Sequence, residues 1–240
     1  MRVLKVVAEG LTTSFRYPHF MMGVQPTYEM PPPATLYGHV ASALGEWFEP
    51  QGVRFAVRFT YAQKQADIEN TILLTPATGR MYQDKSLPKV LEGQVNPFNR
   101  EILFFPRLTL YLNRPEWLKA FRQPHYAVCL GRSQDLFTYR RVEVVDLEHT
   151  SQAYLEHTLL PYDYAHRTAA GHTVLMPRYL DYRRKRHPTF ERYVVLHRRV
   201  HTRDFLHFEG DPLPELWADP TEPYVAGDPL GIVFLSWVEG

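Results

Sequence analysis

The sequence predicts an α+β protein dominated by strands, and three observations lead to that prediction. Short runs rich in β-branched and aromatic residues recur along the chain, as at residues 3–9, 53–63 and 138–148. Two stretches have helical character, and each begins beside proline. The 240 residues, 45% hydrophobic and 14% aromatic, are enough for a large packed core.

A central strand at residues 3–9 is followed by a loop over residues 10–33 and then by a helix. Three consecutive prolines, residues 31–33, keep the chain extended before the helix, and Thr35 is expected to cap its first turn. The helix has an apolar stripe with core spacing and small residues near another face. The two sets are Leu36, Val40, Ala43, Leu44 and Trp47, and Gly38, Ala41, Ser42 and Gly45.

Strand-like runs at residues 53–63 and 102–112, a short helix at 116–121 and a strand at 138–148 complete the first part of the chain. The order over residues 1–150 is strand, helix, strand, strand, helix, strand. This is the order of a ferredoxin-like or RRM-type domain, in which two helices cover one side of an antiparallel sheet.

A long segment at about residues 75–101 interrupts that order and has no sustained hydrophobic period. We expect a protruding hairpin that touches a partner, and the alternative is a mobile insertion without function. Its aromatic, apolar and basic side chains suit contact with nucleic acid. They include Arg80, Met81, Tyr82, Lys85, Lys89 and Arg100.

Residues 151–240 predict a second, small β-rich domain, with strands in 189–208 and 229–240. Charge is unevenly distributed here. Residues 178–203 hold nine Arg or Lys against Asp181 and Glu191, whereas residues 204–240 hold eight acids and no Lys or Arg. The basic run could face nucleic acid. Alternatively, the two segments pair as neighbouring strands and neutralise each other.

Two features near the first helix have the chemistry that RNA binding requires. Free amides and the dipole at a helix start favour phosphate. In residues 14–20 (SFRYPHF), three aromatic rings flank Arg16 and His19, and rings and a guanidinium suit unstacked bases and phosphates. The alternative is that these rings only hold the loop against the core.

Composition excludes several other classes of protein. No apolar run approaches the roughly 20 residues that span a bilayer, and the N-terminus lacks a signal-peptide core, so we expect a cytoplasmic location and no membrane partner. Cys129 is the single cysteine. His197 and His201 would lie about 13 Å apart on a strand, too far for one ion. We therefore expect no metal and no cofactor.

The first strand, SFRYPHF (14–20), PPPATLYGHVASALGEW (31–47), the hairpin-like insertion and LGRS (130–133) together resemble the Cas-five family of CRISPR-associated proteins, in the RAMP superfamily. The resemblance is strongest over residues 1–48 and extends to about residue 150. It implies a non-catalytic subunit of a type I (I-B-like) surveillance complex, Cascade. Such a subunit holds the 5′ handle of the CRISPR RNA and caps the backbone filament, in support of antiviral DNA interference.

The same resemblance implies partners and site residues. The partners are the crRNA 5′ handle and the backbone (Cas-seven-type) and large (Cas-eight-type) subunits, and target DNA near the PAM-proximal end stays open as a further contact. Residues 75–101 would be the thumb that presses on the guide, with the six thumb residues named above. The handle would meet Ser14, Phe15, Arg16, Tyr17, His19, Thr35, Tyr37 and Arg132.

Two alternatives to this function stay open. Some members of the family cut the CRISPR repeat without metal, which requires a base, an acid and a cation. His19, Tyr37, His39, Lys119 and His125 are candidates, but the adjacent Lys-His pair of the cleaving branch is absent from this sequence. We therefore expect no catalytic residue. The second alternative is a protein-interaction module that binds no RNA.

Overall fold

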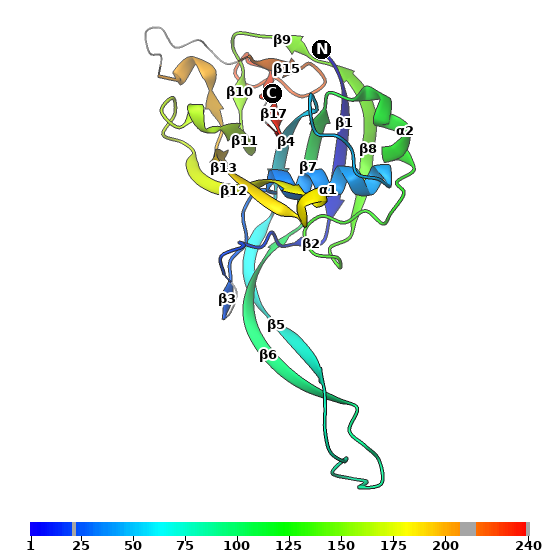
Figure 1. Ribbon diagram of the computed structural model, residues 1–240. Helices are drawn as coiled ribbons and strands as arrows, with labels where there is room; N and C mark the ends of the chain where they lie inside the picture. The colour runs from blue at the N-terminus through cyan, green and yellow to red at the C-terminus, as the bar shows by residue number, and fades with distance from the viewer. Residues whose placement is uncertain (21–22, 207–214, 239–240) are drawn as a thin grey trace.

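The computed structural model, which describes residues 1–20, 23–206 and 215–238, is a mostly β structure with two short α-helices (Figure 1). Its main sheet has eight strands in the order β12-β13-β11-β4-β7-β1-β8, with β17 paired to β4. Their bounds are β1 Arg2–Gly10, β4 Arg54–Thr60, β7 Arg107–Leu112, β8 Phe137–Asp146, β11 Thr158–Pro161, β12 His172–Asp181, β13 His187–Leu196 and β17 Leu235–Ser236.

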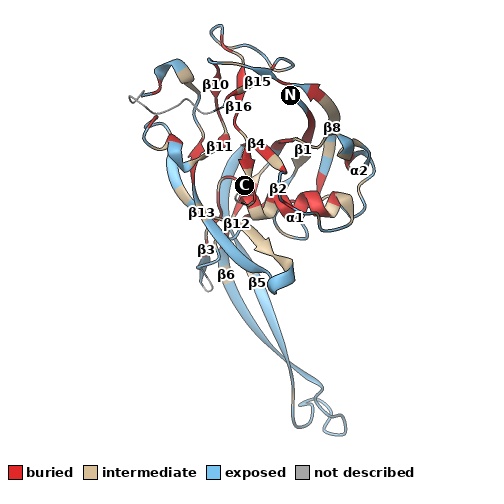
Figure 2. Cartoon of the chain, turned by 45° about the horizontal axis from the view of Figure 1, so that its top comes forward, coloured by how far each residue is buried: buried red, intermediate tan, exposed pale blue. Residues whose placement is uncertain are grey.

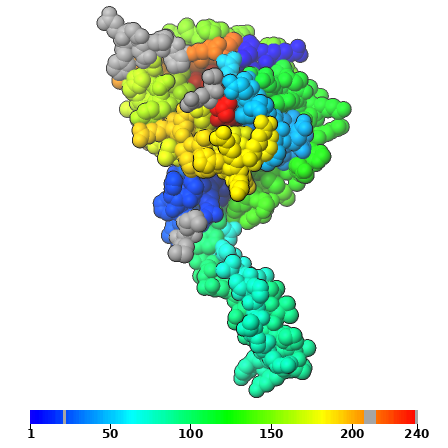
Figure 3. All heavy atoms as spheres, viewed as in Figure 1, coloured from blue at the N-terminus to red at the C-terminus, as the bar shows by residue number. Residues whose placement is uncertain are grey.

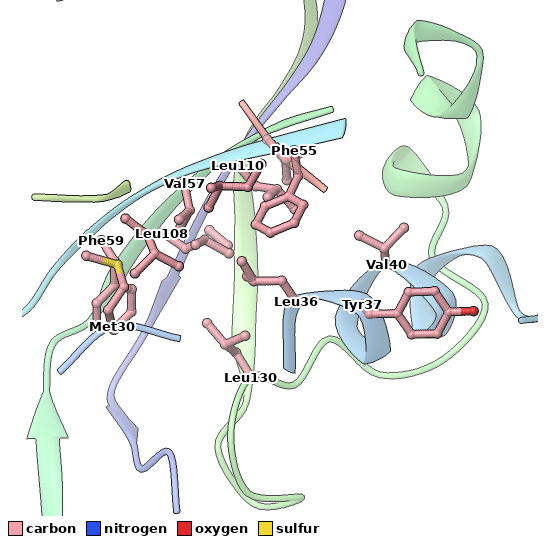
Figure 4. Close-up of a cluster of buried hydrophobic side chains, with 14 of the residues drawn as sticks. Met30, Leu36, Tyr37, Val40, Phe55, Val57, Phe59, Leu108, Leu110 and Leu130 are labelled. Atoms are coloured by element: carbon pink, nitrogen blue, oxygen red, sulfur yellow. The ribbon is translucent and has the colours of Figure 1, made fainter. Parts of the chain in front are cut away.

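The expected order of elements in the first part of the chain is present. Strand β1 lies between β7 and β8 and is antiparallel to both, and β7 is also antiparallel to β4. Helix α1 (Pro33–Leu44) follows β1, and helix α2 (Leu118–Arg122), preceded by a 3-10 turn at Pro115–Trp117, follows β7. The main core lies between α1 and this sheet, where Leu36 and Val40 point toward Phe55, Val57 and Leu110 (Figure 4).

The insertion is a two-stranded ribbon that projects from the body (Figure 1), and it is longer than predicted. Its strands are β5 (Gln63–Pro76) and β6 (Leu91–Phe104), so the arms begin well before residue 75. The prediction of a single strand over 102–112 is wrong. The strand is interrupted at Phe105, where φ is 51°, and β7 begins two residues later. Almost all of the ribbon is exposed (Figure 2), which agrees with the expectation of a protruding hairpin.

Short strands and ion pairs fix the base of the ribbon. Strands β2 (Thr12–Thr13) and β3 (Val24–Gln25) both pair with β6. The Glu69 carboxylate pairs with Arg100 and, at 3.3 Å, with Arg132. The base of the ribbon is therefore attached to the body, while its outer half has no packing partner among the described residues.

The strands after residue 150 divide between two sheets. Strands β11, β12 and β13 extend the main sheet, so the sheet crosses the boundary expected at residue 150. A second, five-stranded sheet combines β9 (Glu148–His149), β10 (Tyr154–Leu155), β14 (Val200–His201), β15 (Trp217–Asp219) and β16 (Leu230–Ile232). The apolar run at 229–238 is divided between β16 and β17, which belong to different sheets. Residues 207–208 and 239–240 of the predicted strands lie outside the described residues.

Among the described residues, the acidic C-terminal segment and the basic run do not pair as neighbouring strands, although Asp228 lies 3.5 Å from Arg203 of that run. The basic strands β12 and β13 pair with each other. Asp219 and Glu222 instead bind the buried Lys5 ammonium, both at 2.6 Å, and the Tyr111 hydroxyl donates to Asp219 at 2.8 Å. This cluster joins the five-stranded sheet to the face of the main sheet opposite α1, where Val3 and Tyr111 pack on Leu230 and Ile232.

We predict that the outer ribbon is dispensable for folding. Replacing residues 72–95 with an Asn-Gly turn would join Thr71 to Asn96, which face each other across the strands. Because the removed side chains are exposed, the free energy of unfolding should change by less than about 1 kcal/mol, or roughly 2–4 °C in Tm. Thermal unfolding followed by circular dichroism measures this change.

A core variant gives the contrast for that measurement. Phe55 is fully buried under α1, and Phe55→Ala should cost about 3–5 kcal/mol. If the shortened protein lost its cooperative transition as Phe55→Ala does, the ribbon would be part of the folding core, contrary to its exposure.

Candidate nucleic-acid interface

Helix α1 begins three residues earlier than predicted. Pro32 is the N-cap and no side chain caps the helix, so the expected role of Thr35 as the cap is wrong. The amides of Thr35 and Leu36 both donate to the Pro32 carbonyl, at 2.8 and 3.1 Å, and Pro33 has no N–H. The helix start therefore offers fewer free amides to an anion than the sequence suggested, although the helix dipole still favours negative charge there.

Core contacts hold α1 in place and leave one side partly exposed, at Ala34, Thr35, Gly38 and Ser42. The Trp237 indole, fully buried and stacked on Phe55 at 4.3 Å, donates to the Pro33 carbonyl at 2.7 Å. Tyr37 is also buried, and its hydroxyl donates to the Phe48 carbonyl at 2.6 Å. Tyr37 was expected at the RNA surface; its ring instead packs against the core, so it supports the helix and does not face a ligand.

A groove of about 530 Å³ runs along the exposed side of α1. Its walls come from the helix, the loop that contains Arg16, the loop at residues 129–131, and the hairpin of β12 and β13, which lies across α1 in Figure 3 (yellow against blue). Arg16 and Arg186 line it, and no acidic residue does among the residues that the structure describes. The other lining residues are Pro18, Ala34, Thr35, Gly38, His39, Ser42, Cys129, Leu130, Gly131, Pro177, Leu180, Pro188 and Phe190.

The rings of residues 14–20 divide between core and surface. Ser14 and Phe15 are buried, and Phe15 packs edge-on against Phe59 at 5.5 Å. The Tyr17 ring is half-buried and stacks on Tyr28 at 3.7 Å. For Phe15 and Tyr17 the alternative interpretation therefore holds, since their rings fix the loop.

The remaining side chains of that loop face outward. Arg16, His19 and Phe20 are exposed. His19 stacks against Phe190 of β13, with ring centroids 5.9 Å apart. The loop and the distant hairpin thus meet beside the groove, and they supply a cation and flat rings at the same place.

The LGRS sequence at 130–133 is a tight turn against the N-terminal strand. Gly131 has φ of 99°, and a Cβ there would come within 2.4 Å of the Thr13 hydroxyl, so only glycine fits. Arg132 was expected to bind RNA. Its guanidinium instead bonds the buried Asp135, at 2.8 and 2.9 Å, and Glu69, so it holds the turn to the base of the ribbon.

Sequence reasoning did not place the tip of the β12–β13 hairpin in the site. This tip, here the basic tip (residues 181–187), has a 3-10 turn at Tyr182–Arg184 and left-handed backbone at Lys185 and Arg186. Four consecutive cations, Arg183 to Arg186, are exposed on it. The nine cations at 178–203 indicated a basic surface in the sequence. The sequence did not reveal that the basic tip lies beside α1.

The thumb residues fall into two places. Arg80, Met81, Tyr82, Lys85 and Lys89 lie in the terminal loop of the ribbon, where Tyr82 is 95% exposed and Arg80 donates to the Lys85 and Ser86 carbonyls. Arg100 was grouped with them, but it lies at the base of the ribbon, buried against Glu69 and Phe98. The terminal loop, residues 77–90, therefore carries three cations against Asp84.

His39 reaches the groove, but both of its ring nitrogens are engaged. Nδ1 lies 2.8 Å from the Cys129 carbonyl and must donate to it, and Nε2 then accepts from the Tyr139 hydroxyl at 3.1 Å. Burial lowers the pKa of His39 below its ordinary value, which keeps the ring neutral. His125 and Lys119 are exposed but are not among the residues that line the groove.

A wider groove of about 760 Å³ lies near the base of the ribbon. Arg107 and Arg140 line it, but each pairs with the Glu9 carboxylate, at 2.7 and 2.8 Å. Because one acid is shared by its two cations, this groove is the weaker attractor for a polyanion.

Among the described residues, no helix is long and apolar enough to cross a membrane.

No family model matches this chain, and no curated protein matches it at a significant level. Similar solved structures include the following three. One described as "CRISPR RNA-guided surveillance complex" has a TM-score of 0.49 and 18% identity, over 83% of this chain and 89% of that chain. "Crystal structure of a CRISPR protein from Archaeoglobus fulgidus" has a TM-score of 0.49 and 12% identity, over 98% and 100%. "Crystal structure of Cas protein" has a TM-score of 0.36 and 11% identity, over 98% and 93%. Function is therefore inferred from the residues and their geometry.

Proposed function

We propose that this protein is a non-catalytic RNA-binding subunit of a type I CRISPR surveillance complex that holds the 5′ handle of the crRNA. The observation that carries the proposal is the groove along α1, which is lined by Arg16, Arg186 and the exposed Phe190 ring and by no acidic side chain among the described residues. Single-stranded RNA is bound by such a combination of cations and stacking platforms. The strand order β8-β1-β7-β4 with two helices on one face is also that of a ferredoxin-like fold.

Each wall of the groove has a different role in binding the RNA. The guanidinium groups of Arg16 and Arg186 bind phosphate, and the dipole of α1 adds positive potential at the same end. Gly38 and Ser42 on the helix allow the sugar–phosphate chain to come close. Phe190 and His19, already in contact with each other, offer a surface on which an unstacked base can lie.

The RNA does not use the sheet face that an RRM offers. In this protein, the five-stranded sheet covers that face around Val3, Ala56 and Tyr111. The binding surface is therefore on the helix side. The ribbon, with its cationic terminal loop, is free to act as the thumb on the guide, and the backbone and large subunits are the proposed protein partners.

The proposal predicts that Arg16→Ala and Arg186→Ala each weaken handle binding. A hydrogen bond to a charged group contributes about 1.5–3 kcal/mol, so the Kd should rise about tenfold or more. If each arginine contacts one phosphate, the slope of log K against log[salt] should fall by about 0.7 per variant. Fluorescence anisotropy with labelled handle RNA over a salt series measures both quantities.

The control is Arg141→Ala. Arg141 is exposed on β8 and is the cross-strand partner of Val7, which places it on the sheet face opposite α1. Its loss should leave the Kd and the salt slope unchanged. Equal losses for all three variants, or none for Arg16 and Arg186, would rule out this groove as the handle site.

The proposal also predicts no cleavage. His39 is held neutral with both nitrogens bonded, so it cannot exchange a proton with a ribose hydroxyl. Purified protein incubated with an unprocessed repeat transcript and a chelator should leave the RNA intact on a sequencing gel. A single discrete cut would assign the protein to the endoribonuclease alternative, and assembly into a complex without any RNA affinity would favour the interaction module.

A further inference from the structure

A second, smaller cleft adjoins the groove toward the far end of α1. It has a volume of about 310 Å³, at the low end for a ligand pocket. Its floor is the small face of the helix, Gly38, Ala41, Ser42 and Gly45, and its walls include Trp47 and Tyr126. Gly38 and Ser42 line both hollows, so the groove and the cleft adjoin each other along α1.

The walls of the cleft are held by specific contacts. The amides of His125 and Tyr126 donate to the carbonyls of Ala43 and Ser42, at 3.1 and 3.4 Å, which docks this segment on the helix end. At Gly45, where φ is 83°, a Cβ would come within 2.5 Å of the His125 ring. The position thus requires glycine, and the Tyr126 side is a built feature of the fold.

The opposite wall is an aromatic stack. Trp47 lies nearly parallel to Tyr182 of the basic tip, with centroids 5.0 Å apart and planes at 12°, and to Tyr37 at 5.9 Å and 10°. Trp47 nevertheless stays 51% exposed and Tyr126 59% exposed. The Tyr126 ring and the exposed edge of Trp47, beside a floor without bulky side chains, offer contact surface for a flat group.

Charge decides which group of a nucleic-acid strand fits here. The C-terminal end of α1 carries the negative end of the helix dipole, and Glu46 also lines the cleft, so a phosphate is disfavoured. A neutral base is not disfavoured at this position. The adjoining groove supplies the phosphate sites at Arg16 and Arg186, and the basic tip, through Tyr182, adjoins the Trp47 wall.

We infer that this cleft takes one unstacked base of the RNA strand whose backbone lies in the groove, with Tyr126 as its stacking partner and the exposed edge of Trp47 as the opposite wall. This inference rests on the proposed function of the groove. It adds a base-binding subsite at the end of α1 opposite to the one that the sequence indicated. The strand then runs along the helix, with phosphates at its start and a base at its end.

The test combines protein variants with abasic RNA. Base–aromatic stacking contributes about 1–3 kcal/mol, so Tyr126→Ala should raise the Kd for handle RNA about 5- to 150-fold. Trp47→Ala, which removes the opposite wall, should also raise the Kd. The salt slope should stay unchanged, unlike that of Arg16→Ala. Trp47→Phe, which keeps a ring, should bind closer to the wild-type protein. Tyr224→Ala is the control, because Tyr224 is equally exposed at 59% and does not line either hollow.

A scan of handle RNAs, each with one abasic position, keeps the test independent of variant folding. One abasic position should weaken binding to the wild-type protein and have no further effect on Tyr126→Ala. If no abasic position is coupled to Tyr126, the inference is wrong, while an effect of Arg16→Ala still upholds the groove. If the wild-type protein binds none of these RNAs, both the inference and the proposed function are overturned.

Discussion

The start of α1 is the constraint on which the candidate site depends. Pro32 and Pro33 allow the helix to begin only after an extended segment, and the buried Trp237 indole fixes that point by its bond to the Pro33 carbonyl. Trp237 comes from the far end of the described chain and stacks on Phe55 of the main sheet. Removing one partner of such a buried bond leaves the other unsatisfied, so the helix cannot shift along its axis without cost. The exposed side of α1 is thereby presented at one place, where the basic tip and the Arg16 loop meet it.

Long-range pairing brings that hairpin to the helix. Strand β13 pairs with β11, and β11 pairs with β4, so the main sheet continues past its first four strands and curls its last hairpin over α1. Tyr179 then packs edge-on against Tyr37, and Tyr182 stacks on Trp47. The outer part of the ribbon, unlike the β12–β13 hairpin, does not pack on α1. A two-stranded hairpin alone is only marginally stable. The base of the ribbon is held by β3 and by Glu69, which binds Arg100 and Arg132, and its outer part is exposed.

Local pattern predicted the elements of the first part of the chain but not how they meet. The stripe Leu36, Val40 and Ala43 is buried as its spacing indicated, whereas Trp47 lies beyond the helix end, where Gly45 adopts left-handed backbone. That glycine was a stop signal visible in the sequence. Tyr37 and Phe15 have the right chemistry for RNA but face inward, because side-chain direction depends on packing that short-range spacing does not encode. Arg186 and Phe190 could not be placed beside Arg16, since the pairing of β13 with β11 is non-local. The charge asymmetry of the second half indicated that a basic surface exists, and only the fold shows where it lies.

The central claim is that single-stranded RNA lies between α1 and the basic tip. Photo-crosslinking of handle RNA that carries 4-thiouridine at successive positions, followed by mass spectrometry of the peptides, tests it most directly. The account predicts crosslinks to residues 14–20 and to the peptide that contains Arg186 and Phe190, from adjacent nucleotides. Crosslinks confined instead to the wider groove with Arg107 and Arg140, where Glu9 already pairs with both cations, would contradict it.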